Sequence, residues 1–133
     1  MQSIKILFFC MMIITLQCYA EINDPNTKKL FTLIATKKYS RQETEIFKNK
    51  KEIYCKTELH PYFVISKESQ EKAIFSQLES LKVESKKNGS IKSCERNESI
   101  IVNINKESYS LCIANPAAAK LLSILSKSCG RNL

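Results

Sequence analysis

The chain has 133 residues, six cysteines, and 21 basic against 13 acidic side chains, which gives a formal net charge of +8. This length suits one domain and excludes two domains of ordinary size. Apolar residues make up 44% of the chain and recur along it, which excludes a long disordered tail.

The first 20 residues have the pattern of a secretory signal peptide. Lys5 precedes an apolar run, residues 6–16, and the segment ends on Ala20. This run is shorter than the roughly 20 apolar residues that a transmembrane helix needs. Cleavage after Ala20 leaves a mature domain, residues 21–133, with four cysteines and a net charge of +7, because the leader takes two cysteines and one lysine with it. We therefore expect export to the periplasm or the extracellular space, with no transmembrane span in the mature chain. An uncleaved anchor and a lipidated Cys18 are the alternatives.

The first element of the mature domain is expected to be a helix. Asp24 and Pro25 suit a helix start, because Asp accepts hydrogen bonds from free N–H groups and proline loses none at the first helical position. The helix would end near Lys38. Its apolar stripe would consist of three residues at helical spacing: Leu30, Leu33 and Ile34.

A second helix is expected to follow. Residues 40–43, Ser-Arg-Gln-Glu, match the capping box S-x-x-E. Apolar residues then recur at i, i+1, i+7 and i+8, which places them on one face of a helix. They are Ile46, Phe47, Ile53 and Tyr54. His60 and Pro61 would end this helix.

A short strand and a third helix come next. Residues 62–65 are aromatic and β-branched, which is typical of a strand. Ser66 suits the start of a helix that ends at the Lys-Lys-Asn-Gly segment 86–89, where cations and glycine favour a helix terminus. Its buried side would carry Ile74, Leu78 and Leu81.

The last third of the chain predicts a hairpin and a helix. The two strands would be residues 99–104 and 108–114. In the second, Tyr109, Leu111 and Ile113 alternate with polar residues and so share one apolar face, which Ile100, Val102 and Ile104 of the first strand would match. Asn115 and Pro116 repeat the cap-and-proline start of a helix that would run to about Ser128.

These elements predict a single α+β domain. Its order would be α-α-β-α-β-β-α. The sheet would be small and antiparallel, with a hairpin at about 99–114 and a short strand at about 62–65. About four helices would pack on it, and two disulfides would staple it.

The four mature cysteines are expected to form these disulfides. They are Cys55, Cys94, Cys112 and Cys129. They are too far apart in sequence for the close pairs of a zinc site. A last helix of about 13 residues, roughly 20 Å, would hold Cys112 away from Cys129 if it folds back along the hairpin. A disulfide needs Cα atoms within roughly 7 Å. Cys94 lies at the Cys112 end, so Cys55–Cys129 with Cys94–Cys112 is favoured over the two other connectivities.

No residue pattern in the sequence indicates a catalytic, cofactor-binding or metal site. His60, the only histidine, has no motif around it, and the mature chain has two glycines, Gly89 and Gly130, so it lacks G-x-S-x-G and phosphate-binding loops. A hydrolase that uses paired carboxylates is the remaining enzymatic alternative. The candidates are Glu43, Glu45, Glu52, Glu58, Glu68, Glu71, Glu79 and Glu84. Solvated helix faces with ion pairs such as Glu52–Lys56 are the favoured interpretation of these glutamates.

The basic balance favours a partner of opposite charge. We expect a binding protein that occludes an acidic protein partner, in the manner of an inhibitor or an immunity protein. The expected contacts are Lys48, Lys50 and Lys51. The alternative is a secreted basic effector or toxin that binds nucleic acid or anionic surfaces. Asn88 and Asn97 stand in N-glycosylation sequons, which matter only in a eukaryotic secretory path.

Overall fold

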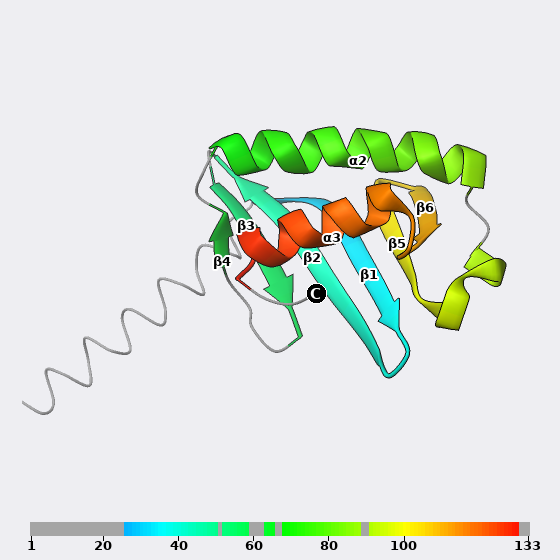
Figure 1. Cartoon of the computed structure of the whole chain (residues 1–133). Coiled ribbons are helices and arrows are strands. Elements are labelled where there is room, and N and C mark those ends of the chain that lie inside the picture. The colour runs from blue at the N-terminus through cyan, green and yellow to red at the C-terminus, as the bar shows by residue number, and fades with distance from the viewer. Residues whose placement is uncertain (1–25, 51, 59–62, 66–67, 89–90, 131–133) are drawn as a thin grey trace, which may run out of the picture.

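A computed structural model describes residues 26–50, 52–58, 63–65, 68–88 and 91–130. In this part of the chain, six antiparallel strands form one sheet and two α-helices pack on it (Figure 1). The α+β class and the two disulfides are found, but the prediction of about four helices around a small sheet is wrong. The expected signal peptide, residues 1–20, lies outside the described residues.

The elements follow one another with short connections. The strands are β1 (Lys28–Lys37), β2 (Ser40–Asn49), β3 (Glu52–Thr57), β4 (Phe63–Ile65), β5 (Ser99–Ile104) and β6 (Glu107–Cys112). The α-helices are α2 (Glu68–Asn88) and α3 (Pro116–Ser128), and two short 3-10 helices lie at Ile91–Ser93 and Glu95–Asn97. The strand order is β4-β3-β2-β1-β5-β6, so β1, the first strand in sequence, lies inside the sheet.

The segment expected as the first helix is the strand β1. Its buried apolar residues are Phe31, Leu33 and Ala35, which recur every second position and therefore share one face of a strand. β-branched residues, Thr32 and Ile34 among them, occupy the positions between, and they suit a pleated sheet. The helical spacing predicted for this segment was a coincidence within a period-2 pattern.

The segment expected as the second helix is the hairpin β2–β3. Ile46 lies opposite Cys55, and both are buried. Of the two i, i+7 pairs that predicted a helix face, Phe47 and Tyr54 lie opposite each other across the turn. Ile46 and Ile53 do not pair, since Ile53 lies opposite Lys48. Lys50 takes a positive φ of 53° in this turn without being glycine, so the usual turn signal is missing. The predicted capping box lies at the start of β2 and caps no helix.

In the second half of the chain, the observed elements agree with those predicted from the sequence. The strand at β4, the helix α2, the β5–β6 hairpin and α3 all occur where they are expected. Asn115 caps α3, with its Oδ1 accepting a hydrogen bond from the Ala117 N–H at 2.9 Å, and Pro116 is the first helical residue. In the hairpin, Ile100 pairs with Leu111, and both are buried.

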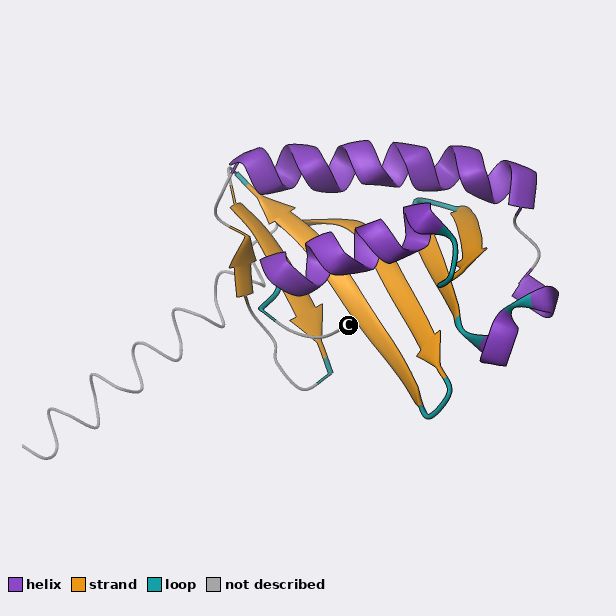
Figure 2. Ribbon diagram, in the orientation of Figure 1, coloured by secondary structure: helices purple, strands orange, loops and turns teal. Residues whose placement is uncertain are grey.

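Both helices cover the same face of the sheet (Figure 2). The core between them consists of the inward side chains of five strands together with one side of each helix. Leu81 of α2 and Leu121 and Leu125 of α3 are fully buried there. Full burial of such a side chain is worth about 1.5–3 kcal/mol, so this layer is the main source of stability.

The helix α3 crosses the strands instead of folding back along the hairpin (Figure 1). Its 13 residues span roughly 20 Å. Four inter-strand spacings of about 4.8 Å separate β6 from β3, about 19 Å in all. The helix therefore starts beside β6 and ends beside β3, where Cys129 reaches Cys55. That disulfide has a Cα–Cα distance of 5.8 Å, and Cys94–Cys112 has 5.2 Å. The connectivity is the one that the sequence favours.

Candidate functional site

The lysines expected to contact a partner have different surroundings. The Lys48 Nζ lies 2.7 Å from the Glu71 Oε1 of α2, so its charge is balanced within the molecule. Lys50 is exposed at the β2–β3 turn. Lys51 lies outside the described residues, as does His60. The role of these lysines in binding stays a prediction. Of the two that the structure describes, Lys48 is less suited to contact a partner than Lys50.

Three of the candidate glutamates gather at one end of the sheet face opposite the one that α2 and α3 cover. A hollow of about 380 Å³ there is lined by Glu43, Glu45, Lys56, Thr57 and Glu58. Glu45 lies on β2, and its carboxylate is 3.3 Å from the Lys29 Nζ and 3.9 Å from the Lys56 Nζ. The sequence prediction had placed these glutamates on a helix. The sheet brings them together because Glu43 and Glu45 are two residues apart on one strand.

This hollow lacks the surroundings of a carboxylate catalyst. A general acid in a glycosidase pair is held protonated by apolar burial. Here Glu43 and Glu58 are exposed, and Glu45 lies between two ammonium groups. The carboxylates of α2 are similarly occupied: Glu68 pairs with Lys72, and Glu79 pairs with Lys82. The expectation of solvated, ion-paired glutamates describes these side chains best, although the pairing Glu52–Lys56 is replaced by Glu45–Lys56.

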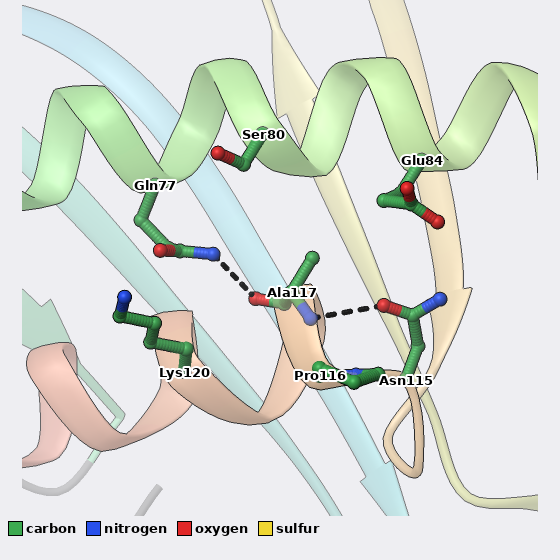
Figure 3. A pocket seen from close by; sticks show the side chains of 7 residues that line it. All are labelled: Gln77, Ser80, Glu84, Asn115, Pro116, Ala117 and Lys120. Atoms are coloured by element: carbon green, nitrogen blue, oxygen red, sulfur yellow. Dashed lines mark hydrogen bonds between the residues drawn. The ribbon is translucent and has the colours of Figure 1, made fainter.

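A second hollow lies between the helices (Figure 3). It measures about 370 Å³ and is lined by Gln77, Ser80, Glu84, Asn115, Pro116, Ala117 and Lys120. Gln77 is 8% exposed, and its Nε2 donates to the Ala117 carbonyl at 3.2 Å. The Ala117 N–H is already bound by the Asn115 cap. These bonds fasten α2 to the start of α3, so the polar groups in the hollow hold the helices together.

The β6 edge of the sheet is covered by α2 at one point. Ser85 Oγ of the helix accepts a hydrogen bond from the Ser110 N–H at 3.0 Å. Beside it, Tyr109 donates a hydrogen bond to the Glu107 carboxylate. This bond, followed by smaller contributions from desolvation and from the charges of Glu107 and Glu79, raises the pKa of Tyr109 above its ordinary value of 10.0.

The tip of the β1–β2 hairpin is the surface that the sequence prediction missed. Tyr39 is 87% exposed there, more than any other large apolar side chain in the described residues. It lies in the turn Lys38-Tyr39, and the Lys38 Nζ is 4.9 Å from the centre of its ring. The expected helices, one ending near Lys38 and the next starting at Ser40, left this segment as an ordinary linker, so the turn was not predicted.

The two sequon asparagines are both exposed. Asn88 ends α2, and its Nδ2 donates to Glu84 at 3.3 Å. Asn97 ends the second 3-10 helix with a φ of 57°. Both therefore lie on the surface, on either side of the segment that joins α2 to β5.

Comparison with protein-family models, curated proteins and solved structures finds no match for this chain. Within the described ranges, no three His, Cys, Asp or Glu side chains come together as metal ligands. None of the helices in that same part of the chain has the length and apolar character needed to cross a membrane.

Proposed function

We propose that this protein is exported and acts by binding and occluding an acidic protein partner, as an inhibitor or an immunity protein does. The observation that carries the proposal is the way the two disulfides fasten the sheet. Cys55 lies on β3 and Cys112 on β6, which are on opposite sides of the sheet. Both sides are thus cross-linked to other elements, and the loops project from a rigid frame.

Rigidity of this kind favours binding. Association carries a free-energy cost for ordering side chains and loops at the interface, and this cost is smaller when the surface is already ordered in the free protein. Two disulfides also suit an oxidising compartment outside the cytoplasm. The excess of 21 basic over 13 acidic side chains supplies long-range attraction to an acidic partner, which raises the rate of encounter.

The test starts from the purified, oxidised protein. It is incubated with the extracellular and envelope proteins of its source cells at low salt, and a recovered partner is then produced pure. We expect a stoichiometric complex by size exclusion with light scattering, loss of the partner's own activity in the complex, and an association rate that falls as salt rises. A partner that binds but keeps its activity would contradict occlusion.

The alternative effector function has its own signature. The basic balance would then attract DNA, RNA or anionic vesicles, and the affinity would fall steeply between 50 and 200 mM salt, as it does for proteins that contact several phosphates. Tight, salt-sensitive binding to one of these probes, with no protein partner recovered, would replace the proposal with this alternative.

A further inference from the structure

We infer that the tip of the β1–β2 hairpin is the part of this protein that enters an acidic recess of the partner protein. The tip is defined as residues 37–41, Lys-Lys-Tyr-Ser-Arg. The inference rests on the proposed function, since it names the surface through which that binding takes place.

The tip projects beyond the neighbouring strands. On one side, β5 pairs with β1 only as far as Thr36, which lies opposite Ser99. On the other side, the described part of β3 pairs with β2 only as far as Thr44, which lies opposite Thr57. The β1–β2 ladder continues past both points to its last pair, Lys37 with Ser40. This last pair therefore lies one residue beyond the last β1–β5 pair and four residues beyond the last pair of β2 with the described part of β3, and the turn protrudes from the sheet in the view of the whole chain (Figure 1).

The side chains of the tip are those that dominate protein interfaces. Tyr39 is 87% exposed, and Tyr and Arg are enriched among the residues that contribute most to binding. Lys37, Lys38 and Arg41 are exposed and lie within two residues of Tyr39 in the sequence, and no acidic residue occurs between positions 37 and 42. The contact of the Lys38 Nζ with the Tyr39 ring at 4.9 Å keeps a cation beside the aromatic face. An exposed aromatic ring with a cation at its face, in a segment that carries further basic residues, complements a pocket with an acidic rim.

The distribution of charge favours a compact recess over a nucleic-acid chain. Glu43 follows Arg41 by two positions on β2, about 7 Å along the strand. On the other side, Glu98 precedes β5, and Arg96 lies between this glutamate and Glu95. The positive surface is thus bounded by carboxylates close behind the tip. A nucleic acid needs a continuous basic groove along its backbone, whereas a pocket in a protein needs only the tip.

The experiment is site-specific photocrosslinking in the full-length protein within its source cells. A photoreactive benzoylphenylalanine replaces Tyr39 in one version and Lys106 in another. Lys106 is a matched control, because it is exposed in the two-residue turn of the β5–β6 hairpin. A third version carries the same group in place of Phe75 on the outer side of α2. We expect a protein adduct from position 39 alone, mapped to an Asp- and Glu-rich segment of the partner.

The outcomes separate the two proposals. Adducts from position 75 or 106 but not from position 39 would overturn the assignment of the tip as the binding surface while leaving the proposed function standing. No protein adduct from any position would overturn both. An adduct to nucleic acid or lipid from position 39 would replace the protein partner with one of those classes.

Binding measurements with the captured partner show how much each side chain of the tip contributes to affinity. Tyr39→Ala should weaken affinity at least 10-fold, and the double variant Lys38→Glu/Arg41→Glu at least 100-fold, whereas Lys106→Glu should change it less than 3-fold. All four positions are exposed in turns or at a strand end, so circular dichroism and thermal midpoints should match the parent. Equal effects of the tip and control variants would show a diffuse charge attraction and contradict a specific contact.

Discussion

Removal of the Cys55–Cys129 disulfide should destabilise the protein more than removal of Cys94–Cys112. The first bridge joins residues 74 apart in sequence and the second residues 18 apart. In the chain-entropy model, the longer loop corresponds to a loss of about 4 kcal/mol of unfolding free energy and the shorter to about 3 kcal/mol. Cys55 and Cys129 are also both 1% exposed, so their replacement removes core packing as well. The difference in free energy should therefore be at least about 1 kcal/mol.

The assay compares Cys55→Ala/Cys129→Ala with Cys94→Ala/Cys112→Ala by guanidinium unfolding at equilibrium. The slope of the transition is recorded for each, because a changed slope reports a change in the denatured state instead. A domain of this size has about 5–15 kcal/mol of stability, so both variants should retain a folded population that gives a measurable transition. A larger loss from the shorter loop, at equal slopes, would refute the reasoning, since neither loop entropy nor burial predicts that order.

Three further changes test local features. Asn115→Ala removes the cap of α3 and should lower the unfolding free energy by about 1 kcal/mol in chemical unfolding, whereas Asn115→Ser should restore most of it; equal values for both would contradict a capping role. A double-mutant cycle on Lys48 and Glu71 should give a coupling of about 0.2–1 kcal/mol that shrinks in high salt, and a salt-independent coupling would show that solvent does not reach this half-buried pair. Glu107→Gln should lower the pKa of Tyr109, followed by absorbance at 295 nm. Because folding raises the pKa of Tyr109, the associated stabilisation is present below the pKa of the unfolded state and disappears as pH rises through the pKa of the folded state. An unchanged pKa of Tyr109 in the variant would refute Glu107 as the cause of the shift.

The second half of the fold was predictable because its signals are local. Asn115 and Pro116 mark the start of α3 by cap chemistry that does not depend on the rest of the chain. The β6 strand alternates apolar and polar residues, Ile100 and Val102 of β5 match its apolar face, and Asn105 suits the positive φ of 56° in the turn between the two strands. The disulfide pairing was also predicted correctly, although α3 crosses the sheet instead of folding back along the hairpin. Both paths keep Cys112 and Cys129 at opposite ends of the helix.

The first half failed because two periods fit the same residues. Leu33 belongs both to a helical triplet with Leu30 and Ile34 and to an alternating set with Phe31 and Ala35. The sequence has no glycine at positions 38–39 or 50–51, so the usual signal that distinguishes a hairpin from helices is missing. The β-branched residues between the alternating positions were the remaining signal.

The surface proposed for binding was missed for the same reason. A turn is visible in sequence only when its strands are recognised, so Tyr39 gained significance once β1 and β2 were placed. The net positive charge of the chain, by contrast, follows from composition alone.

The position of β1 inside the sheet affects the order in which the protein forms. Residues 28–37 are synthesised before the other strands, and β2 can pair with them as soon as it follows. The other edge of β1 has to wait for β5, which begins at Ser99 after α2 has been made. Until then an apolar strand has unpaired N–H and C=O groups, the kind of edge at which chains associate wrongly. We expect pulsed hydrogen exchange to show the amides of β1 that face β5 protected later than those that face β2, so that closure of the sheet from its C-terminal side limits productive folding.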